Sequence, residues 1–316
     1  MVSVEVAPLS DAAARALYER ALPEKVHPAA SLPFVDALAS ALHLHPLILN
    51  AGGATTIVFP RKRFGFEVAS LPPLVARVAI HGPPDTAAGS GAIIAHLEEV
   101  YAQASLLLSA RNHAATGVLN ARGWDGSTRY TFETDTDRLP EDVTAAWSEA
   151  PRRTWKKHRD QFEVAIGGFD DLSMAREAVD LQLSSYRASS DNMGVSRDSL
   201  VVAVDQLLRN RAAYPVVAYD LAGRPTAGVI VLSNATTAVY WLAGSVRGPA
   251  MTILLGNLLS HLRNSGITTF DWAGANNPSI AEFKRRFGPT RVLTPRFRYI
   301  RSSILRVLAR HRPMYR

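Results

Sequence analysis

The chain has 316 residues, of which 47% are hydrophobic and 20% are charged. This length suffices for two cores of ordinary size, since domains usually hold about 100–200 residues. The absence of cysteine excludes disulfides, thiolate metal sites and a cysteine nucleophile. The N-terminus lacks a basic segment followed by an apolar run, and no apolar stretch reaches the roughly 18 residues of a transmembrane helix. We therefore expect a cytoplasmic protein.

The net charge of +7 is concentrated at the C-terminal end. No Asp or Glu follows Glu282, whereas Lys284 to Arg316 contain one Lys and ten Arg. The rest of the chain holds 24 basic and 28 acidic residues and is net negative. Such asymmetry indicates an anionic partner, which could be a phosphate-bearing donor, RNA or a membrane surface, or else a solvated basic face.

The first half predicts strands interrupted by helices. Apolar spacing and turn residues indicate strands at 3–7, 47–51, 55–60, 64–70 and 115–119, and helices at 11–20, 31–42 and 92–109. The polar, acidic segment from 135 to 150 predicts a connection to the second half.

The second half gives a clearer pattern. We expect strands at 162–166, 215–219, 226–232, 236–243, 267–272 and 291–300, and helices at 172–185 and 199–209. A stronger helix is indicated by apolar residues on one stripe, namely Met251, Leu254, Leu255, Leu258, Leu259 and Leu262.

A short helix is expected near residue 280. Asn277 can cap it, Pro278 suits its first turn, and Gly288 ends it. We expect Ile280, Phe283 and Phe287 to form its buried face.

The segment before this helix carries the most informative motif. Asp271-Trp272-Ala273-Gly274 and Phe283-Lys284-Arg285-Arg286-Phe287-Gly288 follow the pattern D-x-x-G … F-K-x-x-F-G. This pattern resembles the signature near the end of FemAB-like N-acyltransferases and their acyl-CoA-dependent relatives. Residues 155–159, Ser185-Tyr186 and the strand from Tyr240 to Gly244 also match. The resemblance covers about 152–288 well and the first half only in outline.

The resemblance implies an α/β (α+β) fold of two tandem GNAT-like domains, each with a mixed central sheet flanked by helices. The element order β-α-α-β-β-β-α-β-α-β of the second half is that of a GNAT domain. We expect an N-terminal, degenerate domain at 1–135 that could bind the acceptor, and a helical connection at 136–160. A catalytic domain at 161–300 and a basic C-terminal helix or tail at 301–316 complete the chain.

The resemblance also implies catalytic roles for Lys284 and Phe283. Attack of an amine on an ester or thioester builds negative charge on the carbonyl oxygen, which a fixed ammonium stabilises. Asp271 could hold the loop, bind an amine or act as a base, and structural duty is an equal alternative. Tyr186, Tyr240 and Asn276 are candidate substrate-binding residues. His43 and His45 lack a third ligand, so we predict no metal site.

The donor is left open between acyl-CoA and aminoacyl-tRNA. The GNAT resemblance implies a pyrophosphate site at a helix N-terminus, where backbone N–H groups and the helix dipole attract anions. The corresponding residues are Ser245, Val246, Arg247, Gly248 and Ala250, but Pro249 removes one N–H. The match to the family pattern is thus only half complete.

The expected acceptor is a small molecule or a cell-envelope precursor. Three alternatives remain: an aminoacyl-tRNA-dependent aminoacyltransferase, a catalytically silent binding protein with this fold, and an unrelated nucleic-acid-binding protein. The C-terminal tail could contact membrane lipid as an amphipathic helix or pack back on the first half.

Overall fold

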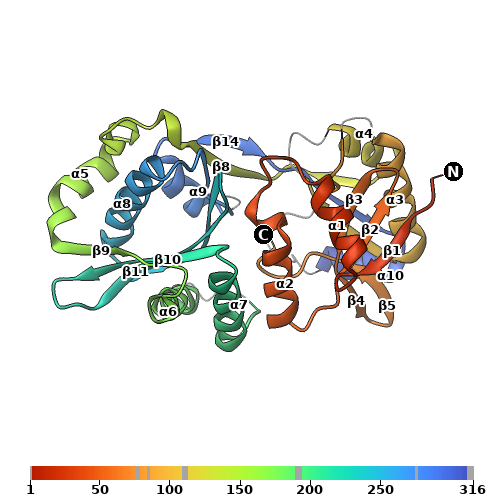
Figure 1. The fold of residues 1–316 in the computed structure, drawn as a ribbon, viewed down its shortest axis with the longest axis horizontal. Helices are drawn as coiled ribbons and strands as arrows, with labels where there is room; N and C mark the ends of the chain where they lie inside the picture. Colours follow the sequence, from red (N-terminus) through yellow and green to blue (C-terminus); the bar gives the residue numbers. More distant parts are fainter. Residues whose placement is uncertain are drawn as a thin grey trace. The chain divides into compact units, whose positions relative to one another are not determined.

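The computed structural model describes residues 2–75, 79–83, 86–108, 113–188, 194–274 and 277–311 (Figure 1). The chain forms two compact units. Unit 1 comprises Met1–Leu32, His43–Tyr130 and Val292–Arg316, and unit 2 comprises Pro33–Leu42 and Thr131–Arg291. The units are not the continuous ranges 1–135 and 161–300, because each unit combines segments from both halves of the sequence.

Unit 2 is built on a seven-stranded sheet in the order β14-β8-β13-β12-β11-β10-β9. From β8 to β9 along this order, the neighbouring strands are antiparallel except for β12 with β13, which are parallel. The strands are β8 (Tyr130–Asp135), β9 (Phe162–Ile166), β10 (Ala213–Asp220), β11 (Pro225–Ser233), β12 (Thr237–Ser245), β13 (Thr269–Asp271) and β14 (Thr290–Leu293).

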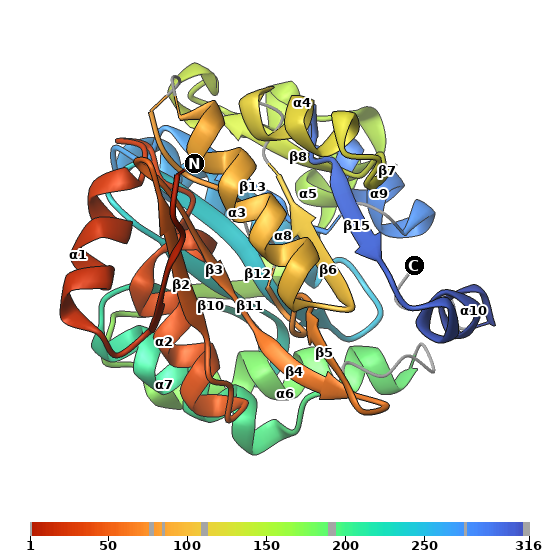
Figure 2. The same cartoon turned by 90° about the vertical axis from the view of Figure 1, so that its right-hand side faces the viewer.

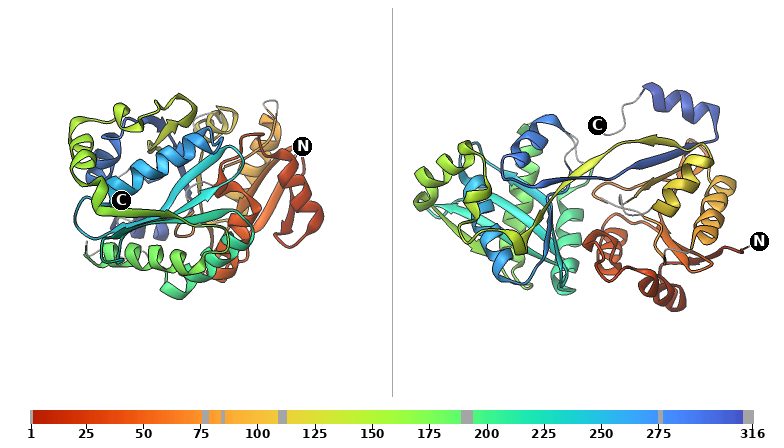
Figure 3. Two further views of the ribbon diagram at one scale, coloured as in Figure 1. Left: turned by 60° about the vertical axis from the view of Figure 1, so that its left-hand side comes forward. Right: turned by 90° about the horizontal axis from the view of Figure 1, so that it is seen from above.

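Helices cover both faces of this sheet (Figures 1 and 3). The helix α6 lies on one face and α8 on the other, and both contact β10, β11 and β12. The predicted apolar stripe of α8 is confirmed, since all six of its members are buried. The helices of unit 2 are α2 (Leu32–Ala41), α5 (Glu149–His158), α6 (Leu172–Ala188), α7 (Arg197–Arg209), α8 (Ala250–Asn264) and α9 (Pro278–Arg285).

Two glycines allow α6 to approach the sheet closely. Gly228 and Gly244 face each other across β11 and β12. A Cβ atom at Gly244 would lie 2.3 Å from the carbonyl oxygen of Leu181, and one at Gly228 would lie 2.7 Å from the Cα atom of Ala178. Only glycine therefore permits this spacing between helix and sheet.

Unit 1 holds a three-stranded sheet, β1-β2-β3, and a five-stranded sheet, β4-β5-β6-β15-β7. The strands are β1 (Glu5–Pro8), β2 (Leu47–Ala51), β3 (Ala54–Val58), β4 (Pro60–Arg63), β5 (Phe66–Ala69), β6 (Gln103–Leu107), β7 (Asp125–Ser127) and β15 (Arg296–Ile300). The helices are α1 (Ala12–Ala21), α3 (Ala87–Val100), α4 (His113–Ala121) and α10 (Ser303–His311).

The two halves of the sequence exchange strands. The strand β8, at the end of the first half, pairs with β13 in unit 2. The strand β15, near the end of the chain, pairs with β6 and β7 in unit 1. The single strand predicted at 291–300 is therefore wrong, because the chain leaves one sheet after Leu293 and enters the other at Arg296.

Two predictions in the first half are also wrong. The helix expected at 92–109 ends at Val100, and the apolar run that follows is the buried strand β6. The strand expected at 115–119 lies in the helix α4, where Ala115 and Leu119 share one buried face at helical spacing. A short apolar run does not tell a strand from a helix. When an element is buried on both sides, its sequence lacks the alternation of apolar and polar residues that shows its period.

None of the described helices has both the length and the apolar character needed to cross a membrane.

We predict that Gly244→Ala lowers the free energy of unfolding by about 2–3 kcal/mol, because the new methyl group collides with the backbone of α6. The matched control is Gly117→Ala in α4, where nothing lies within 4 Å of the new Cβ. This change should raise stability by about 0.5–1 kcal/mol. Urea unfolding measures both, and equal effects of the two substitutions would contradict the close approach of α6.

Candidate functional site

The helix α9 begins and ends as the sequence indicates. The side chain of Asn277 accepts a hydrogen bond of 3.0 Å from the N–H of Ser279, and Pro278 lies in the first turn. The left-handed Gly288, with φ of 78°, follows the helix. The predicted buried face is wrong at Ile280, which is 44% exposed, because the helix turns Ala281 and Lys284 inward instead.

Lys284 is a buried cation, only 4% exposed. Its ammonium donates to the carbonyl oxygen of Trp272, to that of Ala273 at 2.8 Å and to that of Gly274 at 3.1 Å. A lysine ammonium has three donors, so this set of bonds uses all of them. Lys284 therefore ties α9 to the three residues that follow β13.

The charge of Lys284 is held in a site of low polarity. Burial lowers the pKa of its ammonium to about 8, and the negative charge of Asp271 acts in the opposite direction. The ammonium also lies 5.0 Å from the ring centroid of Tyr240, within the range of a cation–π interaction. Three of the residues predicted to form the site therefore lie near one another in unit 2, namely Lys284, Asp271 and Tyr240.

Asp271 stabilises the same turn from its other side. Its carboxylate, which is buried, accepts hydrogen bonds from the hydroxyl of Thr131 and, at 2.7 Å, from the N–H of Ala273. Ala273 has a φ of 48°, a left-handed conformation that non-glycine residues rarely adopt. The bond from its N–H to Asp271 helps hold this strained residue in place.

Three threonines in or next to β8 stabilise the chain around β13, and the sequence did not predict them. Thr131 donates to Asp271, the hydroxyl of Thr134 accepts a 2.9 Å bond from the indole N–H of Trp272, and Thr136 donates to the carbonyl of Ile267. The alternation of apolar and polar residues from Tyr130 to Glu133 is the signal that would have revealed this strand.

The other candidate residues from the sequence have the following surroundings. Phe283 is half-buried, with its ring 5.1 Å from that of Phe287. The hydroxyl of Tyr240 is 3.4 Å from the sulfur of Met251. Tyr186 lies in the last turns of α6. Asn276 lies outside the described residues.

The predicted phosphate site forms the turn from β12 into α8. Ser245 ends the strand, where the hydroxyl of Ser185 donates to its carbonyl at 3.1 Å and accepts from its N–H at 2.9 Å. Val246, Arg247 and Gly248 are exposed, and Ala250 begins the helix. No acidic residue lies in the first turn of α8, so the positive end of the helix dipole faces an open turn.

The strands β12 and β13 part next to this turn. They pair only from Thr237 to Val239 with Thr269 to Asp271, whereas β12 continues to Ser245. Trp241 is an extra residue in the ladder with β11, which is a β-bulge. No other described strand pairs with this edge of β12 beyond Val239.

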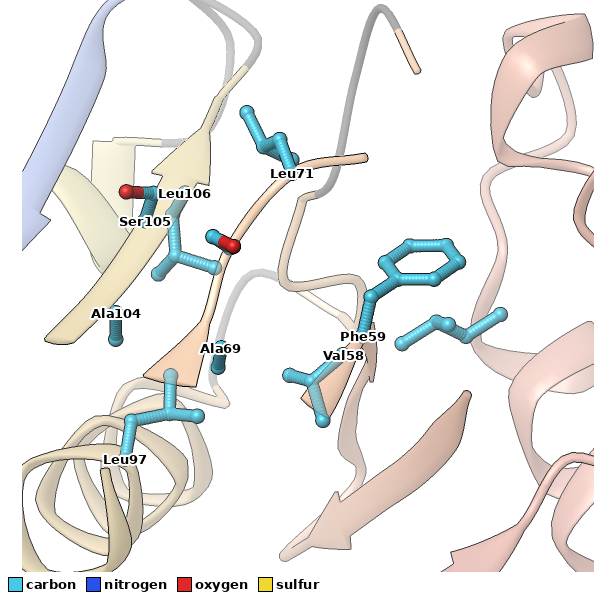
Figure 4. A pocket seen from close by; sticks show the side chains of 10 residues that line it. Val58, Phe59, Ala69, Leu71, Leu97, Ala104, Ser105 and Leu106 are labelled. Carbon is cyan, nitrogen blue, oxygen red and sulfur yellow. The ribbon is translucent and has the colours of Figure 1, made fainter. Parts of the chain in front are cut away.

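Unit 1 has a similar parting between β5 and β6, but with little room. The two strands pair only at Val68 and Ala69. The cavity beyond, lined by residues such as Leu97 and Ser105, holds about 10 Å³ (Figure 4). That is space for about one water molecule. Within the described residues, no group of three His, Asp or Glu side chains is arranged to hold a metal ion.

We predict that Lys284→Met lowers the free energy of unfolding at pH 7 by about 3 kcal/mol, because three carbonyl groups lose their partner and Asp271 loses its nearby cation. The matched control is Arg285→Met, the next residue of α9, whose exposed side chain pairs with Glu282 at 2.8 Å. Its loss should leave stability nearly unchanged. Equal unfolding midpoints for the two variants would contradict a structural role for Lys284.

Comparison with known proteins agrees with this architecture. Residues 149–285 match the sequence model of the acetyltransferase (GNAT) domain. A search of curated proteins found no match.

Among solved structures, that of FemX has a TM-score of 0.69 at 11% identity and covers 96% of this chain and 99% of its own. The C-terminal domain of a putative lysylphosphatidylglycerol synthetase from Agrobacterium fabrum has a TM-score of 0.62 at 12% identity, covering 96% of each chain. A tandem GNAT protein from the clavulanic acid biosynthesis pathway has a TM-score of 0.56 at 16% identity and covers 95% of this chain and 99% of its own.

The structural likenesses show the fold, and the domain match relates residues 149–285 to acetyltransferases. Both agree with the resemblance to FemAB-like proteins that the motif around Lys284 indicated. The chain therefore has a tandem GNAT fold like that of FemX, in which residues 149–285 match the acetyltransferase (GNAT) domain.

Proposed function

We propose that the protein transfers an acyl group from acyl-CoA to the amine of a small molecule or cell-envelope precursor, and that the reaction takes place where β12 and β13 part. The observation that carries this proposal is that β13 pairs with β12 only as far as Val239, while β12 continues to Ser245 and leads into the N-terminus of α8. An extended donor with a phosphate group at one end matches both features.

The turn between β12 and α8 is the proposed diphosphate site. Free N–H groups and the helix dipole at the start of α8 attract an anion. Arg247 is exposed beside them and adds a full positive charge. Gly248, with φ of 139°, brings the backbone through the turn without a side chain in the way. The thioester arm of the donor would then extend along β12.

The proposed reaction forms a C–N bond and breaks the C–S bond of the thioester. The amine nitrogen attacks the carbonyl carbon, the carbonyl oxygen becomes negatively charged, and the thiolate leaves and takes up the proton that the amine releases. Lys284 would stabilise the oxyanion through its positive charge. Because its three donors already bind carbonyl groups, a direct bond to the oxyanion requires exchange with one of them.

An aminoacyl-tRNA donor is the second candidate, and the helix α5 favours it. Arg152, Arg153, Lys156 and Lys157 are exposed on this helix. None of the four forms an ion pair with another described residue, and such a row of cations suits a phosphate backbone. The match to the FemX fold is compatible with either donor.

We predict that Arg247→Gln raises the Kd for coenzyme A about tenfold, because a charge-assisted hydrogen bond is lost. Isothermal titration calorimetry measures this. Arg224→Gln is the matched control, since Arg224 is an exposed arginine of another strand-connecting turn. Equal affinities of both variants, or no binding of coenzyme A, would contradict the donor site. If the protein instead binds aminoacyl-tRNA, and if Arg152→Gln and added salt both weaken that binding, the second candidate is favoured.

We also predict that turnover falls as the pH rises through about 8, because the ammonium of Lys284 loses its proton there. The fall cannot result from unfolding at this group. Its pKa is lower in the folded chain than in the unfolded one, so its contribution to stability rises with pH above 8. In Lys284→Arg, which keeps its charge, the residual activity should lose this descending limb. A limb near pH 8 that persists in Lys284→Arg would contradict a role for Lys284 in turnover.

A further inference from the structure

A bulky aromatic residue occupies the tip of the hairpin that joins β4 and β5. Phe64 is 60% exposed and has a φ of 50°, and Gly65 follows with a φ of 80°. Two-residue hairpin turns with two positive φ values strongly favour Asn-Gly or Asp-Gly. Phenylalanine is unfavourable there for both its backbone and its exposure, which points to a use for the ring outside the fold.

The helix α10 also presents apolar side chains to solvent. Leu305 is buried and packs in a cluster with Val68 and Ala102. Ile304 and Val307, on the adjoining part of the same apolar stripe, are 57% and 53% exposed. The expected packing of the C-terminal helix on the first half thus covers only one edge of its apolar stripe.

The hairpin and α10 adjoin one another within unit 1 (Figure 2). Phe66, two residues after the tip of the hairpin, packs against the cluster that contains Leu305, and so does Ile300, shortly before α10. Phe64 is two residues from Phe66 and Ile304 is next to Leu305, so the exposed Phe64, Ile304 and Val307 flank this cluster. We call these three residues the hairpin–helix patch.

The charges around the hairpin–helix patch are mostly positive. Lys62, Arg63, Arg301 and Arg306 are exposed or half-exposed there. Three carboxylates lie nearby in the sequence. Glu67 pairs with Lys62 at 3.8 Å, Glu98 pairs with Arg122, and Glu99 is exposed. Residues 284–311 contain no acidic side chain at all.

We propose that the hairpin–helix patch binds the surface of an anionic lipid bilayer. Exposed aliphatic and aromatic side chains gain free energy by entering the boundary between headgroups and acyl chains, and arginine and lysine side chains around them are attracted to the lipid phosphates. An aromatic ring at a hairpin tip and a helix that is apolar on one stripe and cationic beside it fit this interface.

RNA is a less suitable occupant of this surface. A phosphate backbone would attract the cations, and a base could stack on Phe64, but neither would cover Ile304 and Val307. The aliphatic part of the patch is therefore the feature that separates lipid from RNA. The inference does not rest on the proposed acyl transfer, and its test needs no donor.

The test is co-sedimentation of the full chain with vesicles of phosphatidylcholine alone and of phosphatidylcholine mixed with phosphatidylglycerol. Binding should require phosphatidylglycerol. Phe64→Ser should lower the partition coefficient about fivefold or more, and Ile304→Ser similarly. Lys62→Gln with Arg63→Gln should lower it about fivefold for each charge removed.

Matched controls separate this surface from charge and apolarity elsewhere. Leu221→Ser removes an 83% exposed residue from the turn between β10 and β11, and Arg152→Gln with Arg153→Gln removes two exposed cations from α5. Both should leave vesicle binding unchanged. Thermal melts establish that each variant is folded. The proposal is wrong if the controls weaken binding as much as the test variants. It is also wrong if Phe64→Ser and Ile304→Ser have no effect, or if they weaken retention of RNA but not of vesicles.

Discussion

The candidate site depends on one interaction, the binding of the Lys284 ammonium to three consecutive carbonyl oxygens. A charge that is 96% buried is costly unless it is fully hydrogen-bonded, and these three carbonyls supply the bonds. The same bonds fix the chain after β13, where Ala273 takes a left-handed conformation. Lys284 thus combines two roles that a surface lysine could not: it shapes the loop beside the parting of β12 and β13, and it places a positive charge there.

The strand exchange gives this arrangement its second support. Thr131, which binds Asp271, comes from the end of the first half of the sequence, 140 residues away. The second half of the sequence alone therefore cannot complete the sheet of unit 2 or supply the hydroxyl that binds Asp271. The reciprocal placement of β15 completes the sheet of unit 1. Each sheet depends on a strand from the other half, which makes the tandem arrangement a requirement of the fold rather than a simple duplication.

The sequence predicted those features that depend on local pattern. The stripe of α8, the cap at Asn277 and most strands of the second half follow from spacing and turn residues, and the motif located Lys284 and Asp271. Other failures, beyond the ambiguous apolar runs at 92–109 and 115–119, depend on distant partners. The division of 291–300 between two sheets and the contact of Thr131 with Asp271 are set by pairing across the whole chain. The three carbonyl bonds of Lys284 likewise arise from a turn that no local preference specifies.

The most direct test of this account is a side-chain nitrogen NMR titration of the lysines, of which the chain has only five. The account predicts that one ammonium signal exchanges slowly with water, titrates near pH 8 and disappears in Lys284→Arg. The contrary result is that all five ammonium signals exchange rapidly with water and titrate with the ordinary pKa of lysine. In that case the ammonium of Lys284 is solvated, and neither the loop geometry nor the placement of the charge at the site depends on it.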